Sequence, residues 1–82
     1  MIKKLQRIPL DSSMLEAAAY DAADNVLYLQ FINTGKVFAY EGVPEDTFRK
    51  LLEANSVGRF VRAEILGCYA DYPVRSGLDF RW

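Results

Sequence analysis

The residues in this sequence that could bind a ligand are aromatic rings and arginines. Phe38 and Tyr40 stand one residue apart in the stretch VFAYE, and Tyr28 lies in the preceding stretch VLYLQFI. Side chains two positions apart on a strand point to the same face. If exposed, such rings could stack on unpaired nucleic-acid bases. The same rings could instead cover one side of the sheet as part of the core.

Arg59 and Arg62 are the best candidates for binding an anion. On a helix, neither has an acidic residue four positions away. Two other helical bases do have such partners, in the pairs Glu45–Arg49 and Asp46–Lys50, and this spacing favours ion pairs on the helix surface. A solvated surface role for Arg59 and Arg62 stays open as the alternative.

Ser56 precedes the segment that contains both arginines and is predicted to cap the N-terminus of a helix. The exposed amides after it, beside Arg59, form the kind of place where a phosphate can bind. The sequence therefore gives one hypothetical RNA-binding set, with the polar face of the sheet added to the helix: Tyr28, Lys36, Phe38, Tyr40, Ser56, Arg59 and Arg62.

The chain has few residues suited to catalysis. It contains no histidine, the commonest general acid or base near neutral pH. Asp21 and Asp24 are interpreted as turn residues. Cys68 is interpreted as a small buried thiol, because it follows a predicted helix C-terminus, whose negative end does not favour a thiolate. We predict no enzymatic activity, no catalytic residue, no metal site and no cofactor.

The composition is that of one small folded domain. The chain has 82 residues, 51% of them hydrophobic, and a net charge of −1. A nucleic-acid-binding domain is usually basic overall, so only a local basic patch is expected. No apolar run reaches the length of a membrane span, and the N-terminal residues lack the apolar region of a signal peptide. The single cysteine fits a reducing cytoplasm.

The order of sequence patterns predicts an α+β domain. Apolar and β-branched stretches indicate an antiparallel meander of three or four strands, and helical spacing with start and stop signals indicates two short helices packed on it. The predicted elements are strands 14–20, 26–32 and 36–41, helices starting at Val43-Pro44 and spanning 57–66, and a short final strand within CYADYPV. Proline is expected at the first helical position, and Gly67 as the end of the second helix.

Asn33-Thr34-Gly35 is predicted to be a three-residue hairpin loop, with Gly35 free to adopt a positive φ. This loop length would pair Tyr28 with Tyr40. It divides the hairpin into a plain core face and an amphipathic face. The predicted core face is Leu27, Leu29, Phe31, Val37 and Ala39, and the predicted amphipathic face is Tyr28, Gln30, Lys36, Phe38 and Tyr40.

The two chain ends are expected to be loosely attached. The predicted organisation is an N-terminal extension at 1–11, a domain at 12–72 and a C-terminal tail at 73–82.

Together these residues resemble the KTSC domain family. The resemblance runs from Ser12 to Tyr72 and rests on an ordered series of short motifs: Leu27-x-Leu29-x-Phe31, Gly35, Phe38-Ala39-Tyr40, Val43-Pro44, Ser56-x-Gly58-x-Phe60, Ile65 and Tyr69. The family occurs as short free-standing bacterial proteins and at the C-terminus of some lysyl-tRNA synthetases. It implies a small domain without known enzymatic activity and with a suspected role in RNA binding. The family's central Tyr-x-Tyr motif is Phe38-x-Tyr40 here, so the first hydroxyl is missing.

Two function classes follow. The first is a non-enzymatic module that binds RNA, either tRNA or single strands, through the aromatic face and the helix arginines. The second is a module for interaction with a protein partner or with another copy of itself. Exposed rings beside Arg59 would favour the first class, and rings buried under the helices the second.

Overall fold

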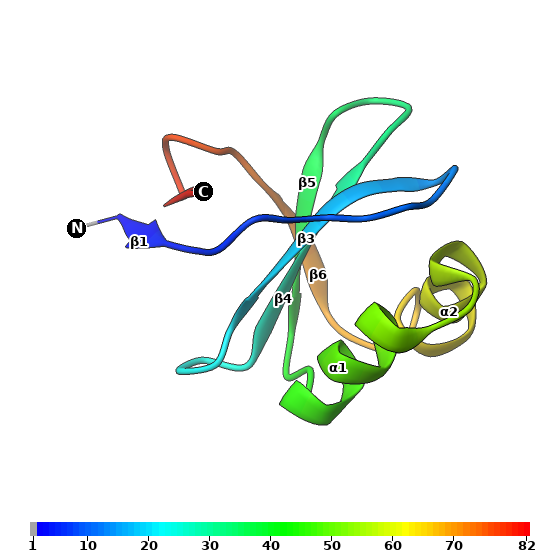
Figure 1. Cartoon of the computed structure of the whole chain (residues 1–82). Helices are drawn as coiled ribbons and strands as arrows, with labels where there is room; N and C mark the ends of the chain where they lie inside the picture. Colours follow the sequence, from blue (N-terminus) through cyan, green and yellow to red (C-terminus); the bar gives the residue numbers. More distant parts are fainter. Residues whose placement is uncertain (1) are drawn as a thin grey trace.

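A computed structural model describes residues 2–82 and has the predicted α+β fold, with more strands than expected (Figure 1). Two helices lie together on one side of a twisted sheet, and both chain ends lie away from them. The strands are β1 (Lys3–Lys4), β2 (Ile8–Pro9), β3 (Leu15–Asp21), β4 (Val26–Phe31), β5 (Val37–Glu41), β6 (Asp71–Val74) and β7 (Phe80–Arg81), and the helices are α1 (Glu45–Glu53) and α2 (Val57–Glu64).

The main sheet has five antiparallel strands in the order β2-β3-β4-β5-β6. The two helices lie between β5 and β6 in the chain. After them, β6 pairs with β5 as the final strand of the main sheet. The predicted final strand is confirmed as β6. The edge strand β2 was not predicted, because two residues are too few to show a strand periodicity.

The hairpin between β4 and β5 differs from the predicted register by one residue. Leu27 pairs with Tyr40, and Tyr28 pairs with Ala39. The loop has four residues, 32–35, because the Phe31 amide donates to the Lys36 carbonyl at 2.9 Å and the Gly35 amide donates to the Phe31 carbonyl at 2.8 Å. A one-residue slip moves every side chain of the return strand to the opposite face, so the predicted face assignment of β5 is wrong.

The helices cover the sheet face that carries the leucines of β4 and the aromatic side chains of β5. A β-bulge between Leu15 and Ala17 lets both Leu15 and Ala18 point to this side. The core on this face consists of Leu15, Ala18, Leu27, Leu29, Tyr40, Val43, Leu51, Val61 and Ile65, with Phe31, Phe38, Phe48 and Phe60 packed against it.

The chain ends cover the other face, so they are not loosely attached as predicted. Tyr28 lies between Ala19 and Ala39 of the neighbouring strands, and these small residues leave room for the fully buried ring of Phe80. Leu5 and Trp82 pack against the same cluster. Strands β1 and β7 pair in parallel, and the Leu5 amide donates to the Arg81 carbonyl at 2.7 Å.

The residues at which the two helices begin and end are close to those predicted. Pro44 is the residue before α1 rather than its first residue, where its missing amide donor costs nothing. Ser56 caps α2 as predicted, with its hydroxyl oxygen accepting from the Arg59 amide at 3.3 Å. Gly67 follows α2 with a φ of 78°, a conformation that favours glycine.

Candidate functional site

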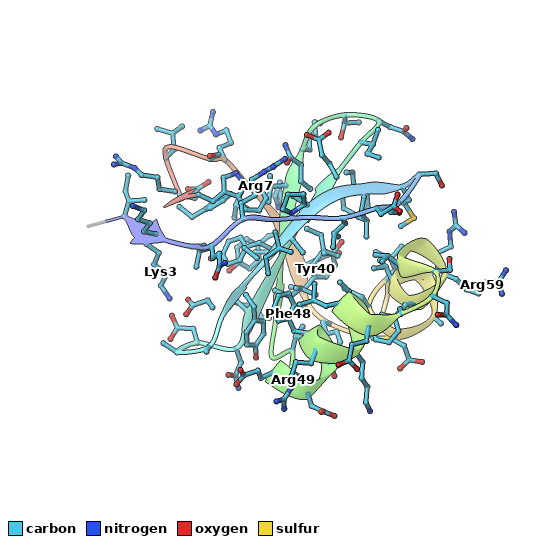
Figure 2. The ribbon with its side chains drawn as sticks, in the orientation of Figure 1. Lys3, Arg7, Tyr40, Phe48, Arg49 and Arg59 are labelled. Atoms are coloured by element: carbon cyan, nitrogen blue, oxygen red, sulfur yellow. The ribbon has the colours of Figure 1, made fainter. Side chains whose placement is uncertain are left out.

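The three rings predicted to form one stacking platform are on opposite faces of the sheet. Tyr40 is 2% exposed and lies under the helices, as Figure 2 shows. Phe38 is half-buried on the same face, edge-on to Phe31 with ring centroids 6.0 Å apart. Tyr28 is 7% exposed on the second face, 4.9 Å from the Phe80 ring. The predicted aromatic platform is therefore absent, because the register slip separates Tyr28 from the other two rings.

Burial favours the neutral form of the Tyr40 hydroxyl. It raises the pKa of Tyr40 to about 12, with a further contribution from the nearby Asp71 carboxylate. The neutral phenol is therefore favoured in the folded state. The folded protein keeps a proton that the unfolded chain loses above its ordinary pKa of 10.0.

We expect the free energy of unfolding to fall as the pH rises from 10 to 12, because the unfolded state binds fewer protons over this range. The Tyr40→Phe variant should lose less stability, since it keeps the ring and removes this titration. Burial also raises the pKa of Tyr20, Tyr28 and Tyr72, so a smaller loss persists. Urea midpoints at pH 9 and pH 11 measure the difference. An equal loss in both proteins would contradict the assignment.

The arginines of α2 remain exposed and form no ion pair within residues 2–82. Arg59 points outward from the helix (Figure 2). On α1, by contrast, Asp46 contacts both Arg49, at 3.8 Å, and Lys50, at 3.4 Å. The predicted Glu45–Arg49 pair is not formed, because Asp46 takes both bases. The prediction that the bases of α1 are paired and those of α2 are not is thus confirmed in outline.

A small polar cleft separates the start of α2 from the chain before β3. We call it the serine–arginine cleft. It has a volume of about 220 Å³ and is lined by Asp11, Ser12, Ser13, Met14, Asn55, Ser56, Val57, Gly58, Arg59 and Arg62. Two guanidinium groups and three hydroxyls thus meet one carboxylate, that of Asp11. The balance favours an anionic ligand.

Two of the three serine hydroxyls of this cleft, those of Ser12 and Ser56, are oriented by backbone amides. The Ser12 hydroxyl oxygen accepts from the amides of Met14 and Leu15, at 3.1 and 3.2 Å. Ser56 accepts from Arg59 in the same way. Each hydroxyl therefore uses its oxygen as an acceptor, and its own proton stays available to a ligand.

The first turn of α2 lies close to the Ser12–Met14 segment. A Cβ atom at Gly58 would lie 3.6 Å from the Met14 Cβ and 3.8 Å from the Ser12 hydroxyl oxygen. The amides of Val57 and Gly58 have no acceptor inside the helix. Both residues line the cleft, and the N-terminus of α2 adds the positive end of its helix dipole.

A second hollow adjoins the serine–arginine cleft, and Arg59 lies between the two. We call it the Phe60 hollow. It has a volume of about 320 Å³ and is lined by Ala54, Asn55, Ser56, Arg59, Phe60, Ala63 and Glu64. Asn55, Ser56 and Arg59 line both spaces. A polar cleft and an aromatic hollow are thus joined on one side of the domain.

Ser12, Ser13 and Phe60 are residues that sequence reasoning did not include in the site. The two serines lie far from Ser56 in the chain, and no spacing rule connects the two segments, whereas Phe60 also packs against the core. Lys36, which was predicted for the site, is exposed beside the β4–β5 loop and lines a different groove with Arg75. Of the predicted set, the structure brings together Ser56, Arg59 and Arg62 only.

Other candidate groups have structural explanations. The Asp21 carboxylate accepts from the Ala23 amide at 3.1 Å, which confirms its turn role, and it also pairs with Lys3. Cys68 is exposed rather than buried as predicted, because it follows Gly67 in a surface turn. Residues 2–82 contain no cluster of metal-ligating side chains and no helix long and apolar enough to cross a membrane.

Comparison with known proteins places this arrangement in a family. The KTSC domain model matches residues 11–69. A protein from Tsukamurella paurometabola is 47% identical over 53 residues, which are 65% of this chain and 78% of that protein. An uncharacterised protein from Stutzerimonas stutzeri is 38% identical over 55 residues, 67% of this chain and 76% of that protein.

A solved structure has the same fold. The crystal structure of a KTSC domain protein from Yersinia pestis superposes with a TM-score of 0.82 at 32% identity, covering 87% of this chain and 99% of that one. The residues matched by the family model, 11–69, include every residue that lines the serine–arginine cleft. The chain belongs to the KTSC domain family.

Proposed function

We propose that this domain is a small, non-enzymatic RNA-binding module that holds a single-stranded segment at the N-terminal end of α2. The observation that carries the proposal is the joining of two hollows at Arg59: the polar serine–arginine cleft and the Phe60 hollow. A nucleotide has the same division into an anionic phosphate and a flat apolar base. The suspected RNA-binding role of the KTSC domain family supports the same reading.

The phosphate is assigned to the serine–arginine cleft. Arg59 and Arg62 supply charge without competing ion pairs within the described residues. Ser12 and Ser56 supply hydroxyl donors, and the start of α2 supplies amide donors. Asp11, also at the cleft, would repel a phosphate, so the charges favour one phosphate group over a run of them.

The base is assigned to the Phe60 hollow. Phe60 is partly exposed there, and an unpaired base can stack on its ring, beside the planar guanidinium of Arg59. The buried rings of Tyr28 and Tyr40 take no part. Binding through one ring and one phosphate site gives modest affinity and little base selectivity, since every base has a flat face.

The expected place of action is the cytoplasm, where RNA is available and where a chain with one cysteine needs no oxidising compartment. The overall charge of −1 predicts that RNA contacts only the α2 side of the domain. Strong dependence on salt is expected for such a local phosphate contact.

Arg59→Gln should weaken binding of all single-stranded RNA sequences alike, because it removes a phosphate contact and not a base-edge contact. The slope of log affinity against log salt should fall by about one unit. Fluorescence titration of labelled oligonucleotides and of tRNA at two salt concentrations measures both quantities. The wild-type protein is expected to prefer the single strands.

Arg49→Gln is the matched control, because it removes the same side chain from the neighbouring helix. Arg49 is exposed and already has Asp46 at 3.8 Å, so its loss should leave the affinity nearly unchanged. Equal effects of the two variants would indicate nonspecific attraction. If the wild-type protein binds none of these RNAs at low salt, the RNA proposal fails.

The second function class, interaction with a protein or with another copy, receives less support from the sheet. Both edge strands carry a proline, Pro9 in β2 and Pro73 in β6. The Glu41 amide donates to the Ala70 carbonyl at 2.9 Å, and the alternation from this bond places the backbone of Pro73 on the outer side of β6. Proline offers no amide there, so extension of the sheet by another strand is disfavoured.

A further inference from the structure

A pocket with a different chemistry lies between the second sheet face and the chain ends, far from α2. We call it the tyrosine–carboxylate pocket. It has a volume of about 420 Å³ and is lined by Lys3, Asp24, Val26, Tyr28, Glu41, Tyr72 and Asp79. Figure 2 shows Lys3 and Arg59 at opposite sides of the molecule. The pocket therefore has no part in the proposed RNA site.

The charges of the lining are unbalanced. Three carboxylates face one ammonium group, that of Lys3, which contacts Asp24 and also Asp21 behind it. Glu41 accepts from the Tyr72 hydroxyl at 3.3 Å, and Asp79 accepts from the Arg75 amide at 2.7 Å. Neither of these two carboxylates has a cationic partner within residues 2–82.

Tyr28 shows that the pocket is more than an acidic surface. Tyr28 is only 7% exposed, yet its hydroxyl has no hydrogen-bond partner in the described part of the chain. Among the described residues, every side-chain nitrogen or oxygen that is fully buried has a hydrogen-bond partner. The small exposed part of Tyr28 therefore includes its hydroxyl, and that hydroxyl opens into the pocket that the residue lines.

The electrostatics agree with this position. Burial raises the pKa of Tyr28, and the Asp21, Asp24 and Asp79 carboxylates raise it further, whereas Lys3 lowers it. Burial and the Glu41 carboxylate raise the pKa of Tyr72, and the nearby Tyr28 raises it further. The two phenols and the carboxylates thus surround one common space, in which the Tyr28 oxygen is available as an acceptor.

We infer that the tyrosine–carboxylate pocket is a binding site for an aliphatic ammonium group, and that Lys3 is its intramolecular occupant in this structure. The carboxylates of Glu41 and Asp79 and the hydroxyl of Tyr28 supply acceptors that Lys3 does not use. An external amine, either a free polyamine or a lysine side chain of a peptide, competes with Lys3 for this space. Lys3 lies on the short strand β1, whose displacement leaves the five-stranded sheet paired.

Spermidine and trilysine are the probes that distinguish the two sources of the ammonium group. Each is titrated at low salt into wild-type protein and into Lys3→Ala, with binding followed by calorimetry and by the NMR signals of the Tyr28 and Tyr72 rings. At least one probe should bind several-fold more tightly to Lys3→Ala, because the competing occupant is gone, and should shift both rings. Preference for spermidine indicates a free polyamine, and preference for trilysine indicates a basic peptide.

Replacing the pocket carboxylates by amides of the same shape tests whether the probe binds in this pocket. Adding Glu41→Gln and Asp79→Asn to Lys3→Ala keeps the hydrogen-bond acceptors and removes two charges, so binding should fall several-fold. Glu53→Gln, an exposed acid on α1, is the matched control and should leave binding unchanged. If Lys3→Ala does not fold, the Glu41 and Asp79 changes are made singly in the wild-type background with the same expectation. Unmoved tyrosine signals, or equal losses with Glu53→Gln, would overturn the inference.

Discussion

Phe80→Ala is expected to lower the free energy of unfolding by about 3–5 kcal/mol, the cost of removing a large ring from a packed core. Phe80 is fully buried although it is the third residue from the chain end. Its ring lies 4.9 Å from that of Tyr28 and 5.0 Å from that of Trp82. The substitution leaves a cavity against the second sheet face. Urea unfolding followed by circular dichroism measures the loss.

Leu78→Ala is the control for this experiment, because it truncates another large apolar residue of the same tail. Leu78 is 61% exposed, so its loss should change stability by no more than about 0.5 kcal/mol. If Phe80→Ala unfolds at the same urea concentration as the wild-type protein, the tail does not cover the sheet and the loosely attached end predicted from sequence would be correct.

Tyr40→Ala is expected to be similarly damaging, at about 3–5 kcal/mol, because Tyr40 is in the centre of the core between the sheet and the helices. A domain of this size has a total stability of only about 5–15 kcal/mol. The variant should therefore be partly unfolded at elevated temperature. Differential scanning calorimetry and the dispersion of the NMR spectrum report the outcome.

Tyr72→Ala is the matched control, since it removes the same side chain from the edge strand β6. Tyr72 is 40% exposed, so the expected cost is about 1 kcal/mol or less. A stable, well-dispersed Tyr40→Ala protein would mean that Tyr40 faces solvent. The aromatic stacking platform would then again be a candidate for RNA binding.

These two core residues also decide where RNA can bind. Because the helices cover one sheet face and the chain ends cover the other, no ring of the platform predicted from sequence is left as a broad exposed surface. The proposed RNA site therefore depends on α2, on Arg59 and on the partly exposed ring of Phe60. Stability and binding can be tested separately, because Arg59 is outside both cores.

Short-range sequence patterns are sufficient to predict the local elements and the family. VLYLQFI is β-branched and aromatic, so it forms a strand in most contexts, and it is β4 here. Ser56 specifies a helix start through one side-chain hydrogen bond, and that bond is present. The absence of an acidic residue four positions from Arg59 or Arg62 is also a local property. Each of these signals depends on residues within a few positions of one another.

The strand register, the segments that cover the sheet and the composition of the site depend on contacts between distant parts of the chain. Asn33-Thr34-Gly35 is compatible with a three-residue or a four-residue loop, and one residue of difference reverses the face of Phe38 and Tyr40. Leu5 and Phe80 meet because the main sheet has a second apolar face to bury. Ser12 reaches Gly58 because β3 and α2 pack on one core. Such contacts between distant segments depend on the burial of whole faces, which no short pattern encodes.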